Sequence, residues 1–454
     1  MARYSKVLIQ IVTIFLFTGR AAPSFGAVET FTNPVISDGA DPWIVYREGY
    51  YYLTYTTGSN VQIHRATRLT GTNGIGQAGV IAAFYPPAPF NQDIWAPELH
   101  FLHGKTYLYY AADDGNNADH RMFAAESDTT GPTFTFVAKG KVYDPTTDHW
   151  AIDGTVLEAT NGSLYFIWSG WPGTQDGLQN LYIAPMSDPL TISGPRVLLA
   201  TPDQPWESWI EEGPEVLQRD GVVFVVYAAN LSWTDNECLG MLVNRDGNYL
   251  SPASWTKSSS PVFATVTTTN GSVYGPGHCG FTKSLDGTED WIFYHAAKYS
   301  GAGWNRNIRM QSYSWTTNGY PSFGQPVPAE LALPIPSGDA FTSARFDTIA
   351  PQTDGTVRLV VSAPLPLLTN QWRLEFSGDL NQWITVTNVP GAQFSINFVD
   401  GPSVSNRFYR VQSLRSILVQ GLSQLGFLIR SWSLRVKPVP ASTKPYPVHT
   451  ARMR

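Results

Sequence analysis

Three carboxylates, Asp41, Asp153 and Glu212, each stand near the start of a repeated segment and could carry out acid–base chemistry. Hydrolysis of a glycosidic bond needs a carboxylate that deprotonates water and a carboxylic acid that protonates the departing oxygen. Three carboxylates crowded at one site would raise the pKa of at least one of them, and that group would then stay protonated near neutral pH. The third group would act through its position and its charge.

Two other interpretations apply to these acids. A single Asp before Pro, as in Asp41-Pro42, is ordinarily a turn residue that caps its own backbone, but this interpretation weakens when acids head several repeats. Three acids could also hold calcium. Calcium takes about six to eight oxygen ligands, usually from one loop, whereas these acids are spread over separate repeats.

The acids belong to a segment that the chain repeats five times. In each copy an opening residue starts a strand, a turn with Gly follows, and an aromatic strand returns. The opening residues are Asp41, Trp95, Asp153, Glu212 and His278, which lie 54, 58, 59 and 66 residues apart. A repeat of this length indicates a repeat architecture.

The turns and returning strands predict β-hairpins. The turn glycines are Gly49, Gly104, Gly162, Gly221 and Gly287. The returning segments 50–55, 106–110, 164–168, 222–227 and 291–294 are β-branched and aromatic, which suits a buried pleated surface. Five such units of four strands predict an all-β fold, a five-bladed β-propeller over residues 28–340. The innermost strands of a propeller line one channel, so we expect the five opening residues to converge there.

The composition supports a large core and disfavours a nucleic-acid partner. The 454 residues are 43% hydrophobic and 13% aromatic, enough for one large and one small domain. Only 15% are charged, the net charge is −6, and no basic stripe interrupts the repeats. The 15 Trp and 22 Tyr suit sugar-stacking surfaces and ordinary propeller cores equally.

The N-terminal segment 1–27 reads as a signal peptide. Arg3 and Lys6 precede an apolar run over 7–18, and small residues follow at 24–26. The run is too short for a membrane span, so we expect a secreted or periplasmic protein. Export would permit a disulfide between Cys238 and Cys279, but two buried free thiols explain the sequence at least as well.

The C-terminal part differs in texture from the repeats. Short strands separated by Gly, Asn and Asp predict a small antiparallel β-sandwich over 346–412. The tail 413–454 lacks acidic residues, and its apolar residues recur at helical spacing before a Pro-rich end. It could be a basic amphipathic helix on a membrane surface, a disordered tail or a frame error.

Five motifs in order resemble glycoside hydrolase family 43, over about residues 31–328. They are Ala40-Asp41-Pro42, Trp95-Ala-Pro-Glu98-Leu-His100, Ala151-Ile-Asp153-Gly-Thr155, Glu212-Gly-Pro-Glu215 and Gly275-Pro-Gly-His278. The resemblance implies an inverting mechanism on α-L-arabinofuranosides or β-xylosides. By motif, Asp41 would be the general base, Asp153 the residue that tunes the pKa and orients, and Glu212 the general acid.

The resemblance also implies a sugar pocket and an ion. Trp95, Glu98, His278 and Arg309 would bind the substrate. His278 matches a channel histidine that in several members helps to hold a calcium or other ion through water. A structural calcium ion in the channel is therefore expected, and no organic cofactor.

The runs 120–122, 168–171, 179–184 and 286–291 look most like the exo-acting α-L-arabinofuranosidase branch. The expected function is release of terminal α-L-arabinofuranosyl residues from arabinan, arabino-oligosaccharides or arabinoxylan, with a plant cell-wall polysaccharide or oligosaccharide as the partner. A β-xylosidase or endo-arabinanase on the same scaffold is the nearest alternative. A non-catalytic sugar-binding propeller is another, although it would not need a base, an acid and a modulator together.

Overall fold

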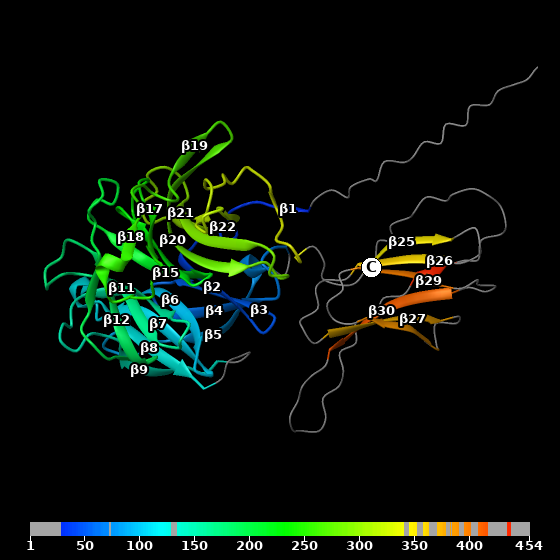
Figure 1. Ribbon diagram of the computed structural model, residues 1–454, viewed down its shortest axis with the longest axis horizontal. Helices are drawn as coiled ribbons and strands as arrows, with labels where there is room; N and C mark the ends of the chain where they lie inside the picture. The colour runs from blue at the N-terminus through cyan, green and yellow to red at the C-terminus, as the bar shows by residue number, and fades with distance from the viewer. Residues whose placement is uncertain are drawn as a thin grey trace, which may run out of the picture.

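The computed structural model describes residues 29–71, 74–128 and 134–339, and beyond them the backbone of the strands between Arg345 and Val436 (Figure 1). The expected signal peptide 1–27 lies outside the described residues. Among those described, no helix is both long and apolar enough to cross a membrane. Three short 3-10 helices occur there, at Ile75–Gln77, Asn117–Asp119 and Pro252–Ser254.

Five antiparallel sheets form the predicted blades, here numbered I to V. Blade I contains β2 (Ala40–Arg47), β3 (Tyr50–Thr56), β4 (Val61–Ala66) and β5 (Val80–Phe84). Blade II contains β6 (Gln92–Leu102), β7 (Lys105–Asp113), β8 (Arg121–Ser127) and β9 (Val137–Lys141). Blade III contains β10 (Ala151–Glu158), β11 (Leu164–Gly170), β12 (Asn180–Asp188), β13 (Thr191–Ile192) and β14 (Val197–Ala200).

Blade IV contains β15 (Glu211–Arg219), β16 (Val222–Ala229), β17 (Cys238–Asn244) and β18 (Trp255–Lys257). Blade V contains β19 (Val266–Thr268), β20 (Gly271–Lys283), β21 (Asp290–Ala297), β22 (Arg306–Trp315) and β23 (Pro321–Ser322). The first long strands, β2, β6, β10, β15 and β20, contact one another in cyclic order, and β20 contacts β2. The five-bladed propeller is therefore confirmed.

The predicted hairpins are confirmed by the backbone. Each turn glycine has a positive φ, between 72° at Gly287 and 86° at Gly49. Glycine suits these turns because it lacks the Cβ atom that disfavours the left-handed region. Each returning strand then pairs antiparallel with the innermost strand of its blade.

The core is divided among the interfaces between neighbouring blades. Five clusters of buried side chains fill these interfaces, one for each pair of adjacent blades. Tyr109 of blade II, for example, packs on Phe166 of blade III with ring centroids 5.5 Å apart, and both are fully buried. Burying one such ring stabilises the fold by about 1.5 to 3 kcal/mol, so aromatic returning strands bind blade to blade.

The segment before blade I closes the ring. The backbone N–H groups of Val35 and Ile36 donate to the carbonyl of Ile308 on β22 at 2.9 and 3.2 Å. The side chain of Asn33, which is buried, donates to the carbonyl of Met310 at 3.0 Å and accepts from its N–H at 2.9 Å. Further out, β1 (Thr30–Phe31) pairs with β24 (Leu333–Pro334). The two ends of the propeller are thus joined by hydrogen bonds.

A β-bulge interrupts each innermost strand at the same point. In blade I, Ala40 and Trp43 pair with Thr56 and Thr54, so Asp41 and Pro42 oppose Tyr55 alone. The other blades repeat this two-against-one arrangement with Pro or Gly in second place. The first bulge residues are Asp41, Ala96, Asp153, Gly213 and Gly275, with φ values of 55°, 40°, 55°, 53° and 50°.

These bulges correct the predicted alignment of the repeats. Asp41 and Asp153 are equivalent, but Trp95 and Glu212 stand one residue before their bulges. His278 lies three residues after Gly275, at a second irregularity of β20 where its φ is 28°. The bulge residues of blades II, IV and V are Ala or Gly, and neither residue type marks a bulge in the sequence. Spacing alone therefore favours the neighbouring Trp95, Glu212 and His278 as the equivalents of Asp41.

The C-terminal strands form two antiparallel sheets. One contains β25 (Arg345–Pro351), β26 (Val357–Ser362) and β29 (Ser395–Asp400). The other contains β27 (Asn370–Ser377), β28 (Ile384–Val389), β30 (Arg407–Arg415) and β31 (Leu434–Val436). The sandwich over 346–412 stays a prediction, because most side chains of this part are not among those described.

The tail prediction of a helix or disorder is wrong for Leu434–Val436, which pairs with Arg407–Tyr409 of β30. Apart from this strand and the end of β30, the tail lies outside the described residues.

Candidate active site

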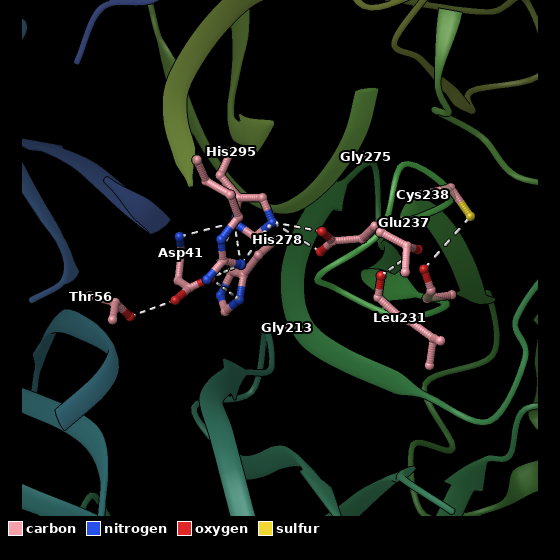
Figure 2. Close-up of polar contacts among 12 residues, drawn as sticks. Asp41, Thr56, Gly213, Leu231, Glu237, Cys238, Gly275, His278 and His295 are labelled. Atoms are coloured by element: carbon pink, nitrogen blue, oxygen red, sulfur yellow. Dashed lines mark hydrogen bonds and ion pairs between the residues drawn. The ribbon is translucent and has the colours of Figure 1, made fainter. Parts of the chain in front are cut away.

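The entrances of three innermost strands bring Asp41, Asp153 and His278 together. His278 Nδ1 lies 3.6 Å from Asp41 Oδ1 and 3.8 Å from Asp153 Oδ2. All three side chains are largely buried. Two carboxylates from blades I and III therefore lie beside one imidazole of blade V, so three of the five opening residues meet. Figure 2 shows Asp41 beside His278 and His295.

Asp41 is surrounded by positive charge and hydrogen-bond donors. Thr56 Oγ1 donates to Asp41 Oδ2 at 2.5 Å, and Arg306 NH1 lies 3.4 Å from Oδ1. Burial alone would raise the pKa of Asp41. The charge of Arg306 and the hydrogen bond with His295 hold the pKa of Asp41 well below its usual range. Asp41 is therefore a carboxylate at any working pH.

Glu212 has the opposite environment. Burial raises the pKa of Glu212, and the negative charges of Glu237 and Asp41 raise it further. A hydrogen bond from Ser232 and the charge of Arg306 lower it. Together these effects give Glu212 a pKa of about 7. A carboxyl group with this pKa is partly protonated at neutral pH. The pKa values of Asp41 and Glu212 are therefore shifted in opposite directions.

Asp153 is buried within range of the charges of both groups. Its Oδ2 accepts the backbone N–H of Gly213, the bulge residue of blade IV, at 3.0 Å. Burial raises the pKa of Asp153 well above its usual value, and the charges of Glu212 and Asp41 raise it further. The carboxyl group therefore links blade III to the strand entrance that carries Glu212.

The bulges position these groups through their own backbone. A bulge residue lacks a ladder partner, so its N–H must find another acceptor. The N–H of Ala96 donates to Thr56 Oγ1 at 2.7 Å, and the N–H of Asp41 donates to His295 Nδ1 at 3.1 Å. Together with Gly213, three bulges bond to a side chain of the preceding blade, which ties the site together around the channel.

His278 does not offer a complete cage for the expected calcium ion. Burial lowers the pKa of His278 to about 4, so its ring is neutral and could act as a ligand. Calcium prefers oxygen, however, and no group of three His, Cys, Asp or Glu side chains among the described residues is arranged to hold a metal. The calcium ion stays a prediction, and no step below depends on it.

The other predicted substrate-binding residues differ in position. Trp95 is half-buried, and its ring stacks on His120 with centroids 4.0 Å apart. Glu98 lies beyond the bulge of blade II and is buried, with Oε2 2.7 Å from His100 Nε2. Burial raises the pKa of Glu98. Its charge in turn contributes to the raised pKa of Asp153, so it lies near the site without a hydrogen bond to the three acids.

Arg309 lies inside blade V, and its predicted role in substrate binding stays a prediction. It is buried, its Nε donates to Asn307 Oδ1 at 2.8 Å, and it pairs in register with Tyr294 inside blade V. Arg306, three residues earlier at the start of β22, contacts Asp41 instead. Sequence reasoning also missed Thr56, His295 and Glu237. His295 stands near the end of an aromatic strand, and no pattern distinguished it from a core residue.

Exposed aromatic side chains lie in two loops near Ser232 and Arg306. Trp233, 39% exposed, follows Ser232 in the loop between β16 and β17. Trp304, 62% exposed, lies in the loop between β21 and β22, and its ring is 5.4 Å from that of Trp233. The guanidinium of Arg306 lies 5.1 Å from the Trp304 ring centroid. The mouth beside the acids thus presents aromatic faces suited to stacking on sugar rings.

The two cysteines are free thiols. Cys238 and Cys279 are both buried and form no disulfide. The alternative of two buried thiols is therefore confirmed, and burial raises the pKa of both groups, which keeps them unreactive.

Comparison with known proteins gives concordant results. A family model described as Glycosyl hydrolases family 43 matches residues 31–321. The chain is 37% identical over 349 residues to an extracellular exo-alpha-(1->5)-L-arabinofuranosidase of Streptomyces avermitilis, covering 73% of this chain and 68% of that protein. It is 34% identical over 380 residues to alpha-L-arabinofuranosidase 43 of Humicola insolens, covering 77% of each.

The same holds among solved structures. An alpha-L-arabinofuranosidase from Lactobacillus brevis superposes with a TM-score of 0.60 at 35% identity, covering 66% of this chain and 98% of that one.

Proposed function

This chain belongs to family 43 of the glycosyl hydrolases, and we propose that it is an inverting exo-α-L-arabinofuranosidase. Its substrates would be arabinan, arabino-oligosaccharides or arabinoxylan of plant cell walls, from which it releases terminal α-L-arabinofuranosyl residues. The relatives named above support the sugar, and the names of the Streptomyces avermitilis relative and of a second one from Streptomyces chartreusis specify the exo action on (1->5) linkages. The word extracellular in these names supports secretion.

The observation that carries the mechanism is the opposite electrostatic setting of two carboxyl groups. Asp41 is held ionised by Arg306 and His295, so it is the candidate base that removes a proton from water. Glu212 has a pKa of about 7, so it is the candidate acid that protonates the departing oxygen. Water attack on the face opposite the leaving group inverts the anomeric centre.

Asp153 would orient the acid side of the site. Its Oδ2 holds the N–H of Gly213, directly after Glu212 in the chain. Its proximity also raises the cost of ionising Glu212, because like charges in one buried site repel. An inverting site needs carboxyl groups about 6.5 to 9.5 Å apart to admit the water, and we expect Asp41 and Glu212 to meet this condition.

A parallel assay tests the proposed substrate. We expect the purified chain to hydrolyse nitrophenyl α-L-arabinofuranoside and to release arabinose stepwise from arabino-oligosaccharides. Preference for nitrophenyl β-xyloside would indicate a xylosidase instead. Early appearance of mid-length fragments from linear arabinan would indicate endo action.

A further inference from the structure

Glu237 and His295 form a buried hydrogen-bonded pair behind Asp41. Glu237 lies at the end of the loop before β17 of blade IV, and His295 lies on β21 of blade V. Each side chain is only 1% exposed. His295 Nε2 lies 2.9 and 3.0 Å from the two carboxylate oxygens of Glu237. Burying two such groups is costly unless both are fully bonded.

The other nitrogen of His295 contacts Asp41. Figure 2 shows the ring between Asp41 and Glu237, which come from blades I and IV. His295 Nδ1 accepts the backbone N–H of Asp41 at 3.1 Å and lies 3.1 Å from Asp41 Oδ1. A chain of polar contacts therefore runs across three blades and ends on the candidate base.

The direction of the amide group assigns the ring proton. When the ring is neutral, the Asp41 N–H points at Nδ1, so Nδ1 carries a lone pair and the proton is on Nε2. Nε2 then donates to Glu237. If the ring gains a second proton, Nδ1 can donate to Asp41 Oδ1 instead. In either state of the ring, Glu237 holds one nitrogen and Asp41 is held by the other.

Asp41 needs this support because its backbone is strained. Its φ of 55° is in the left-handed region, which costs a non-glycine residue about 1 kcal/mol or more. The neighbouring blade is shaped around the pair as well. A Cβ atom at Gly277 would lie 1.8 Å from Glu237 Oε1, so any larger residue there would displace the carboxylate.

We propose that His295 and Glu237 are positioning residues for the base. Glu237 fixes the orientation and tautomer of His295, and His295 fixes the backbone and carboxylate of Asp41 toward the attacking water. The inference rests on the proposed role of Asp41 and adds two residues that touch neither sugar nor water. His295 reaches the reaction through Asp41, and Glu237 acts through His295 in addition to the effect of its charge on Glu212.

Substitutions of His295 test the link to Asp41. We expect His295→Ala to lower kcat about 100-fold, because a misplaced base loses its alignment with water, and to leave KM within about threefold. His295→Asn keeps an acceptor near the position of Nδ1 and should retain clearly more kcat than Ala. A raised KM with unchanged kcat would assign His295 to sugar binding and overturn the proposal.

A double-mutant comparison separates positioning from an independent role. In an Asp41→Asn background, His295→Ala should cause no further loss, because the base is already absent. An equal loss in both backgrounds would refute the action through Asp41. Activity of Asp41→Asn alone within tenfold of wild type would show that Asp41 is not the base. That result would refute the proposed function, and it is distinct from the His295 results because it comes from the Asp41→Asn variant alone.

Glu237 needs a control of equal burial. Glu237→Ala should lower kcat about tenfold or more, whereas Glu237→Gln keeps an acceptor for Nε2–H and should retain most of it. Glu207 of the same blade region is fully buried in an ion pair with Lys257, so Glu207→Ala should lower the melting temperature without lowering kcat. A kcat loss in Glu207→Ala as large as that in Glu237→Ala would reduce Glu237 to a structural role.

Discussion

At the scale of residues, two carboxyl groups of one site are driven to opposite proton states. Arg306, His278 and His295 surround Asp41, while Glu212 faces burial and the charges of Glu237 and Asp41. The proposed roles of base and acid therefore follow from the neighbours of each carboxyl group and not from its residue type. The motif around each acid could be predicted from the sequence, but its neighbours come from other blades and could not.

Glu212→Gln should discriminate between leaving groups. An acidic phenol departs with little protonation, so hydrolysis of a nitrophenyl arabinofuranoside should fall much less than that of an arabino-oligosaccharide. The measurement is kcat/KM on both substrates. Glu215→Gln is the control, since Glu215 is a buried carboxyl group on the same strand. Equal losses on the two substrates would take the acid role from Glu212 and make Glu211 or Glu215 the next candidate.

The pH dependence of kcat/KM should report Glu212. Activity needs the protonated form, so the rate should fall as pH rises through about 7, where the pKa of Glu212 lies. Glu237→Gln removes a negative charge that raises this pKa, so the alkaline limb should move to lower pH. If Glu237→Gln lowers the maximal kcat/KM but leaves the apparent pKa of the alkaline limb unchanged, Glu237 does not act on Glu212.

At the scale of elements, the β-bulges of the innermost strands position the residues of the site. Each bulge frees an N–H, and three of these bond to a side chain of the preceding blade. Hairpin turns and aromatic strands follow from local composition, so they could be predicted. The bulge register could not, because Ala96, Gly213 and Gly275 carry no signal, and this is why Trp95 and Glu212 were aligned with Asp41.

The strand register, which the sequence does not show, also decides which of two neighbouring arginines contacts Asp41. Arg306 and Arg309 stand three residues apart on β22, and only the strand's alternation and its entry point decide which reaches Asp41. Arg309 instead bonds to Asn307 within blade V. Sequence spacing places both near the site, and the three-dimensional register separates them.

Lys257 joins blade IV through a buried charge cluster. Its Nζ lies 2.5 Å from Glu211 Oε1 and 3.0 Å from Glu207 Oε1, and both acids are fully buried. Lys257→Met would leave these carboxylates uncompensated, so we expect a loss of about 3 to 5 kcal/mol in the free energy of unfolding. Urea unfolding measures this value.

An exposed pair supplies the comparison. Lys283 is 59% exposed and pairs with Asp290 on the surface, so Lys283→Met should cost less than about 1 kcal/mol. Similar losses in the free energy of unfolding for the two lysine variants would show that the buried pair is no more important for stability than the surface pair.

At the scale of the whole molecule, the active site depends on a closed ring. Asp41 enters from the first blade, while His278, His295 and Arg306 come from the last. The segment before blade I joins these two blades through Asn33 and Val35. The site is therefore assembled only when the two ends of the propeller meet.

Asn33→Ala tests this closure. The substitution removes two hydrogen bonds to Met310 and leaves its buried N–H and carbonyl without these partners, so we expect a loss of about 1 to 3 kcal/mol. Activity at low temperature should persist but be lost at a lower temperature than in wild type. Unchanged thermal inactivation would show that the ring is held without this contact.

The central claim is that Asp41 and Glu212 hydrolyse an α-L-arabinofuranoside with inversion. The direct measurement is proton NMR of the sugar released from nitrophenyl α-L-arabinofuranoside, recorded before the product mutarotates. The account predicts that the β-anomer appears first, because water attacks from the side opposite the leaving group. First appearance of the α-anomer would show retention through a covalent intermediate and contradict the roles assigned to both carboxyl groups.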